Sequence, residues 1–161
     1  MTSPPRPILI LALGNDIMGD DGVALAAARA LKENLAADVD LVESPEAGLA
    51  LLDAMAGYDR VLLLDSITTG RHPPGTVLEF SSKDFNKVVG PSPHYAGLPE
   101  VLELARRLDI DFPGEVCVLA LEIERPLDFR ETLSPQIEQA LPAYVERAAR
   151  ILRRWKGAQN R

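Results

Sequence analysis

One stretch near the amino terminus, residues 7–22 with the sequence PILILALGNDIMGDDG, constrains the fold more than any other. It opens with an unbroken run of aliphatic residues, Ile8 to Leu13, which predicts a β-strand buried on both faces. The chain then breaks at Gly14 and reaches an Ala-rich helical segment whose start carries Asp20 and Asp21. A buried strand, a turn and a helix start form the unit around which α/β proteins place their functional groups.

The rest of the chain alternates between short apolar runs and helical patterns. Further strands are predicted over 40–43, 61–64, 76–80 and 116–121, and helices over 20–34, from Ser44-Pro45 to near Gly57, over 98–108 and from Ser134-Pro135 onward. The connection TTGRHPPG is too short for a crossover helix, so the strand after it should lie antiparallel at an edge. We therefore expect a single α/β domain over residues 1–161, a three-layer sandwich on a mostly parallel, twisted five-stranded sheet with one antiparallel edge strand. Its ends, 1–6 and 157–161, are expected to be flexible.

The start of the first predicted helix carries two acids, Asp20 and Asp21, although capping of the helix requires only one. Asp is a preferred N-cap residue, and negative charge near a helix amino terminus is stabilising by about 0.3–1 kcal/mol. Capping accounts for one of the two. Asp21, placed beyond the carboxyl end of a strand, could instead face a cation, although a purely capping role for both stays an alternative.

A second acid follows a second apolar run. Asp65 comes directly after VLLL, and a carboxylate at that position costs several kcal/mol unless it reaches solvent, a partner or a metal. We therefore expect Asp65 at the end of its strand, facing outward. A helix cap or a turn residue is the alternative.

A histidine in a proline- and glycine-rich loop completes the candidate set. His94 lies in GPSPHYAGLPE, whereas the other histidine, His72, lies in the exposed-looking turn RHPPG. A loop histidine is commonly a surface residue, but if a metal is bound, His94 is the better candidate. Asp21, Asp65 and His94 would offer two carboxylates and an imidazole, and three protein ligands leave positions open for water or substrate.

The combination of GNDIMGDDG, the acid after VLLL and the segment SPHYAGL resembles the hydrogenase maturation endopeptidases, over roughly residues 8–152. The resemblance implies that Asp21, Asp65 and His94 are both metal ligands and catalytic residues. It also implies a nickel-dependent endopeptidase that removes the carboxyl-terminal extension from the nickel-loaded precursor of a hydrogenase large subunit. The nickel is expected to arrive with the substrate, and zinc or cadmium to substitute for it in vitro.

Two segments depart from the family pattern. Many relatives carry GxGN after the first strand, whereas this chain has Ala12 in place of the first glycine, a change expected to be harmless. Relatives often have an acid, a Gly-Gly pair and Thr after the second strand, where this chain reads ESPE over 43–46. We expect the second departure to affect which precursor is recognised.

The residues leave the chemistry of cleavage partly open. No Ser/His/Asp set is legible, and Cys117 lies in the apolar stretch EVCVLAL, which predicts a buried side chain and not a nucleophile. A water activated by the metal, or by a carboxylate acting as general base, is the favoured mechanism. The resemblance implies that the activity is that of an aspartic-type endopeptidase. A chaperone-like module that inspects the nickel site without cutting is the alternative. A nucleotide-binding domain is disfavoured, because the turn lacks GxGxxG and a P-loop lysine and its acids would repel phosphate.

Composition limits the partners. The net charge of −7 argues against a nucleic-acid binder, and the single cysteine excludes an intrachain disulfide and a cysteine-based zinc cluster. No segment approaches the roughly 20 apolar residues of a membrane span, and the amino terminus lacks the apolar core of a signal peptide. We expect a monomer that works in the cytoplasm.

Overall fold

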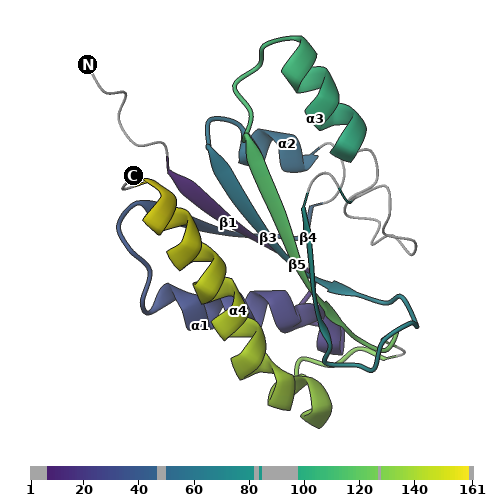
Figure 1. Ribbon diagram of the computed structural model, residues 1–161. Coiled ribbons are helices and arrows are strands. Elements are labelled where there is room, and N and C mark those ends of the chain that lie inside the picture. The colour runs from purple at the N-terminus through teal and green to yellow at the C-terminus, as the bar shows by residue number, and fades with distance from the viewer. Residues whose placement is uncertain (1–6, 47–49, 82–83, 85–97, 127, 160–161) are drawn as a thin grey trace.

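A computed structural model describes residues 7–46, 50–81, 84, 98–126 and 128–159. Its centre is a five-stranded sheet with helices on both faces (Figure 1). The strands are β1 (Ile8–Leu13), β2 (Val39–Ser44), β3 (Arg60–Ile67), β4 (Val77–Ser81) and β5 (Glu115–Glu122). The helices are the short 3₁₀ helix η1 (Gly19–Gly22), α1 (Val23–Lys32), α2 (Ala50–Met55), α3 (Leu98–Arg107) and α4 (Pro135–Gln159).

The sheet has the strand order β2-β1-β3-β5-β4. All neighbouring strands pair in parallel except β4, which pairs antiparallel with β5 at the edge. The prediction of a mostly parallel sheet with one antiparallel edge strand is confirmed. Because β2 and β3 lie on opposite sides of β1, the chain reverses its direction of travel there, and ligands of such sheets bind beside the carboxyl ends of the strands at this reversal.

Alternate residues of each central strand serve two separate cores, as the period of two along a strand requires. On one face α1 and α4 cover a core that includes Ile8, Ile10 and Leu62. On the other face, where Figure 1 shows α2 and α3, the core includes Leu9, Leu11 and Leu63. Both faces of the first apolar run are therefore buried, and the bounds of this strand are those predicted.

Three predicted helices differ in extent. The helix expected to begin at Ser44-Pro45 does not begin there, because Ser44 is the last residue of β2 and α2 is Ala50–Met55. The helix expected over 20–34 is divided into η1 and α1, so the two acids lie in a 3₁₀ turn ahead of the α-helix. At the other end of the chain α4 extends through Gln159, so residues 157–159 of the expected flexible end are helical, while 1–6 and 160–161 lie outside the described residues. Among the described helices, none combines the length and the apolar character that crossing a bilayer demands.

Candidate functional site

Gly14 brings the acidic turn back over the end of β1. Its φ of +149° is one that side chains rarely adopt, and a methyl group at this position would overlap the backbone carbonyl oxygen of Asp21. The absence of a side chain at Gly14 therefore permits the close approach of two backbone segments. This contact places Asp21 at the carboxyl edge of the sheet.

The carboxylate of Asp21 is held by two donors. Its Oδ2 accepts a hydrogen bond from the backbone nitrogen of Asn15 at 3.0 Å, and its Oδ1 accepts one from the hydroxyl of Ser66 at 2.8 Å. Each carboxylate oxygen can accept about two hydrogen bonds, so each keeps capacity for a metal or a proton. The side chain is half-buried and reachable from solvent.

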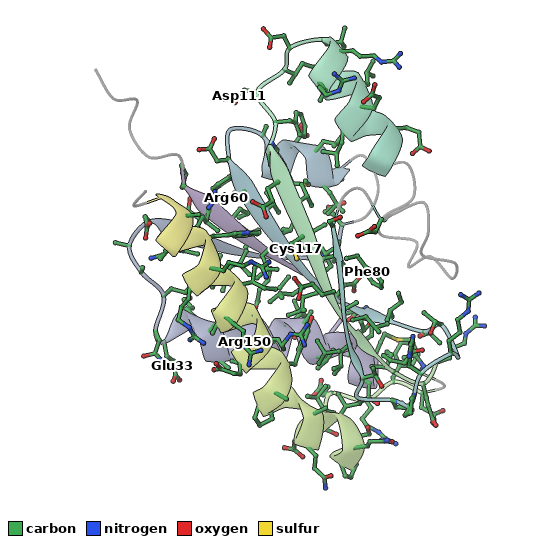
Figure 2. All side chains as sticks on the ribbon, in the orientation of Figure 1. Glu33, Arg60, Phe80, Asp111, Cys117 and Arg150 are labelled. Carbon is green, nitrogen blue, oxygen red and sulfur yellow. The ribbon has the colours of Figure 1, made fainter. Side chains whose placement is uncertain are left out.

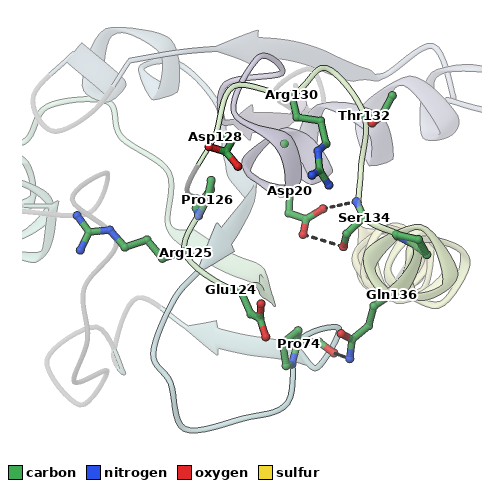
Figure 3. A pocket seen from close by; sticks show the side chains of 12 residues that line it. Asp20, Pro74, Glu124, Arg125, Pro126, Asp128, Arg130, Thr132, Ser134 and Gln136 are labelled. Atoms are coloured by element: carbon green, nitrogen blue, oxygen red, sulfur yellow. Dashed lines mark hydrogen bonds between the residues drawn. The ribbon is translucent and has the colours of Figure 1, made fainter.

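Asp20, its neighbour, has a different task. Both of its oxygens bind Ser134, accepting from the backbone nitrogen at 2.7 Å and from the hydroxyl at 2.8 Å, as Figure 3 shows. Ser134 directly precedes α4, so Asp20 fastens the acidic turn to the start of the last helix. A parallel bridge between Met18 and Arg130 joins the same two segments. The two adjacent acids thus divide their roles, which answers the question of why the turn carries both.

A groove of about 490 Å³ borders this turn. Asp20, Ser134, Glu124, Arg130 and Gln136 are among the residues that line it (Figure 3). It therefore provides space for a ligand directly beside the turn that carries Asp21.

The position of Asp65 corrects the prediction that this residue ends its strand and faces outward. β1 pairs with β3 only as far as Leu64, but β5 continues the ladder through Ile67, so β3 runs two residues beyond Asp65. Asp65 has an exposed fraction of 0%. At Asp65 the pairing with β1 has ended while the pairing with β5 continues. The residue therefore lies beside the position where the strand order reverses, between β1 and β3.

Ser66 and Tyr144 form hydrogen bonds with the two acids, and the sequence alone does not predict these contacts. The backbone nitrogen of Ser66 donates to Oδ1 of Asp65 at 2.8 Å, while its hydroxyl reaches Asp21. The buried hydroxyl of Tyr144 accepts from the backbone nitrogen of Asp65 at 3.1 Å and lies 2.7 Å from the carbonyl oxygen of Leu119, to which it donates. A serine and a tyrosine carry no sequence signal for these tasks.

Tyr144 keeps its proton. Burial, and secondarily the charge of Asp65, raises the pKa of the Tyr144 hydroxyl well above its ordinary value. The hydroxyl is therefore a hydrogen-bond donor throughout the physiological pH range.

Two acids at the carboxyl end of β5, Glu122 and Glu124, differ in their exposure to solvent. Glu124 is exposed, as expected of a strand-end charge, but Glu122 has an exposed fraction of only 1%. Glu122 accepts hydrogen bonds from the backbone nitrogen of Thr69 at 2.9 Å and from the Thr69 hydroxyl. Glu122 is therefore shielded from solvent, because the connection after β3 folds back over it.

Cys117 is buried, with an exposed fraction of 5%, on the face of β5 that α4 covers (Figure 2). Burial, followed by the charge of Glu79, raises the pKa of the thiol to about 12. The structure thus agrees with the interpretation of this cysteine as an apolar core residue.

Arg29 connects the segment 43–46, which differs from the family pattern, to the loop after β1. Its guanidinium donates to both oxygens of Glu43, at 2.9 and 3.3 Å, and to Asp16 at 3.3 Å. These hydrogen bonds, with the one to Glu43 the largest influence, raise the pKa of Arg29. The carboxylate of Glu43 is therefore engaged within the protein.

The third predicted ligand, His94, lies outside the described residues. Among the residues that are described, no three histidine, cysteine or acidic side chains form a metal-ligating group. Asp21 and Asp65 reach one edge of the sheet and share Ser66, whereas His72 lies in an exposed turn. Two carboxylates so arranged can bind a cation or transfer a proton.

Comparison with known proteins gives consistent matches. A family model described as "HycI: Hydrogenase maturation protease" matches residues 24–151. The Hydrogenase 2 maturation protease of Escherichia coli is 28% identical over 153 residues, which cover 91% of this chain and 90% of that protein. The hydrogenase expression/formation protein HoxM of Cupriavidus necator is 30% identical over 155 residues, covering 93% and 76%.

Two solved structures match over most of their length. The hydrogenase maturating endopeptidase HybD of E. coli has a TM-score of 0.76 at 25% identity, with coverage of 92% of this chain and 93% of that chain. The [NiFe] hydrogenase maturation protease HybD of Thermococcus kodakarensis has a TM-score of 0.70 at 26% identity, with coverage of 90% and 98%.

Proposed function

Because this chain belongs to the hydrogenase maturation protease family, we propose that it removes the carboxyl-terminal extension from the nickel-loaded precursor of a hydrogenase large subunit. The resemblance of its motifs to that family is confirmed, and the chain is a protease of this family. Nickel dependence and the nature of the precursor are the parts that we propose.

One observation carries the proposal: Asp21, in the 3₁₀ turn that follows β1, and Asp65, in the neighbouring strand β3, both bind Ser66 at the reversal point of the sheet. We propose that these two carboxylates, together with His94, contact the nickel that the substrate carries. The chemistry of the donors fits, because carboxylate and imidazole ligands suit divalent transition metals and Asp21 retains acceptor capacity on both oxygens. A protease that needs the metal of its substrate does not cut an unloaded precursor.

Cleavage is then a hydrolysis of the peptide bond, for which the metal of the substrate, when held by Asp21, Asp65 and His94, would supply Lewis-acid chemistry. Asp21, half-buried and reachable from solvent, accepts the proton of the attacking water and returns it to the amine that leaves. Asp65, which is fully buried, contributes by electrostatic attraction to the positive charge of the metal that the substrate carries. The groove beside Asp20 leaves room for the substrate chain that adjoins the cleaved bond.

The direct test is incubation of a nickel-loaded precursor with the protein and measurement of the precursor mass. Asp21→Ala, Asp65→Ala and His94→Ala should each abolish the mass loss while the variants remain folded by circular dichroism. His72→Ala, which changes the exposed histidine, is the matched control and should cleave normally. Cleavage by the His94 variant would remove that residue from the mechanism, and a precursor whose mass never changes would favour the chaperone-like alternative.

A second test needs no precursor. Calorimetric titration of the free protein with nickel, zinc and cadmium should give one-to-one binding that His94→Ala loses. If wild type and variant bind none of these ions, the free protein has no metal site, and the precursor assay alone tests the roles of the three residues.

The remaining expectations stay predictions. Sedimentation would test the expected monomer, and cell fractionation the expected cytoplasmic location. The segment at 43–46 is proposed to influence the choice of precursor, which exchange of this segment between relatives would test.

A further inference from the structure

We propose that Ser66 is a positioning residue that fixes the Asp21 carboxylate relative to that of Asp65. The contacts are properties of this chain alone, but the catalytic consequence rests on the function proposed above. Ser66 is buried, with an exposed fraction of 6%, and it uses two different groups. Its backbone nitrogen donates to Asp65 Oδ1 and its hydroxyl to Asp21 Oδ1, both at 2.8 Å.

The strand explains how one residue reaches both acids. Successive side chains point to opposite faces of a sheet. Leu62 and Leu64 belong to the core under α1 and α4, whereas Leu63 and Ile67 belong to the other core. By this alternation Ser66 faces the side on which η1 and Asp21 lie, and Asp65 faces the other side. Ser66 is thus the connection between two carboxylates that approach the edge from opposite faces.

Ser66 is also the better anchored partner. It pairs with Leu121 within the β3–β5 ladder, which continues beyond it to Ile67 and Glu122. Asp21, in contrast, lies in a four-residue 3₁₀ turn. Within the described part of the chain, the other hydrogen bond to its carboxylate comes from the backbone nitrogen of Asn15, in the loop just before that turn. Among the described contacts, the hydrogen bond from the Ser66 hydroxyl is therefore the one that fixes the Asp21 carboxylate to the sheet.

The expected effect follows from the role of such supporting hydrogen bonds. Removal of a residue that orients a ligating or catalytic group typically costs about 10–100-fold in activity or metal affinity, and a misplacement of about 1 Å can cost on the order of 100-fold in rate. Ser66→Ala should therefore lower kcat for the nickel-loaded precursor by about 10–100-fold. KM should change little, since Ser66 is buried and offers almost no surface to a docked protein.

Matched variants separate positioning from folding. Ser66→Thr keeps the hydroxyl on a β-branched residue suited to a strand and should retain most of kcat. Ser66→Cys is nearly isosteric but a weak donor, and it replaces the alanine variant if that variant unfolds. Ser81→Ala is the control. Ser81 is the last residue of β4 and pairs with Cys117, its hydroxyl donates to Asp84 at 2.8 Å, and the loss of this hydroxyl should leave kcat unchanged.

A second readout uses neither metal nor substrate. The side-chain carboxyl carbon of Asp21, assigned by comparison with Asp21→Asn, is observed by ¹³C NMR in the free protein. Its resonance should move in Ser66→Ala and return toward the wild-type position in Ser66→Thr. If the wild-type protein cleaves no precursor, the proposed function fails, yet this resonance still tests the contact.

Three results would overturn the proposal. One is an unchanged Asp21 resonance in Ser66→Ala. Another is a shifted resonance with unchanged kcat, which would make the contact real but without consequence. The third is an equal loss of kcat in the alanine and threonine variants in parallel with a lowered unfolding temperature, which would indicate a structural role only.

Discussion

Tyr144 of α4 accepts a hydrogen bond from the backbone nitrogen of Asp65 in β3, at 3.1 Å, in the fully buried part of the protein. The same hydroxyl donates to Leu119 of β5 at 2.7 Å and so joins two strands at the position of a candidate catalytic acid. The last helix is therefore part of the structure that supports the site.

Tyr144→Phe is expected to lower the free energy of unfolding by about 1–3 kcal/mol, because the buried backbone groups of Asp65 and Leu119 lose their hydrogen bonds to the Tyr144 hydroxyl. Denaturant titration measures this loss. Tyr58→Phe is the control, since the hydroxyl of Tyr58 donates to the exposed Asp40 at 2.8 Å, and its removal should cost clearly less. Equal losses in the two variants would contradict the role of Tyr144.

The adjacent acids should respond in opposite ways to the same substitution. Asp20→Asn weakens two hydrogen bonds to Ser134 and should cost about 1–3 kcal/mol of stability while some cleavage remains. Asp21→Asn should abolish cleavage with a smaller loss of stability. Parallel unfolding and cleavage assays test the pair, and complete loss of cleavage in a folded Asp20→Asn protein would contradict the division of roles.

Gly14→Ala is expected to reduce both stability and cleavage. The added methyl group overlaps the carbonyl oxygen of Asp21 and must displace the acidic turn. Gly57→Ala provides the control, because Gly57 also has a positive φ, of +85°, but nothing within 4 Å of the added carbon. If the two variants cleave equally well, the close approach to Asp21 is dispensable.

Glu79 should contribute stability that depends on pH. Partial burial raises the pKa of this carboxyl, but hydrogen bonds from Arg147 and Arg154, at 3.0 and 3.3 Å, lower it by more, so it lies below its ordinary value of 4.5. A depressed native pKa gives stability that is present above the unfolded pKa and is lost as the pH falls through the native value.

Glu79→Gln should therefore cost on the order of 1 kcal/mol at pH 7, and the difference from wild type should shrink as the pH falls below about 4.5. Urea denaturation at a series of pH values measures it. Glu33→Gln, which removes the same charge from an exposed acid labelled in Figure 2, is the control for the change in net charge alone. A constant difference across the series would contradict the assignment to the two arginines.

Cys117 should be inert in the folded protein. With a pKa of about 12 the buried thiol carries almost no thiolate at pH 8, so iodoacetamide should label it only after denaturation. Mass spectrometry measures the labelling, and Cys117→Ala should retain cleavage. Loss of cleavage in a stable Cys117→Ala protein would reopen the possibility of a cysteine nucleophile.

The pattern of the sequence was sufficient for the sheet because its cues are local. The aliphatic run at Ile8–Leu13 predicts β1 with its observed bounds, and the short turn before β4 predicts the antiparallel edge. The prediction that β3 ends at Asp65 was wrong for a physical reason. The last residues of β3 pair with β5, more than fifty positions away, and no local signal in the sequence reports that pairing.

The candidate site was predictable only as a set of residue types. Asp21 and Asp65 stand out because acids after apolar strands are costly, yet nothing local separates Asp21 from Asp20. Their roles differ because of Ser134, 114 positions from Asp20. The burial of Glu122 likewise depends on Thr69, 53 positions away. His94 lies outside the described residues and stays a prediction.

The link between Asp20 and Ser134 also has a consequence for the order of events during synthesis. At about 5–20 residues per second, the ribosome adds Ser134 roughly 6–23 s after Asp20, which lies 114 positions earlier. Until Ser134 has been added, the acidic turn lacks its attachment to the start of α4, and until Tyr144 has followed, Asp65 lacks the hydroxyl of that residue. A nascent chain is thus expected to reach its full cleavage activity only after α4 has emerged.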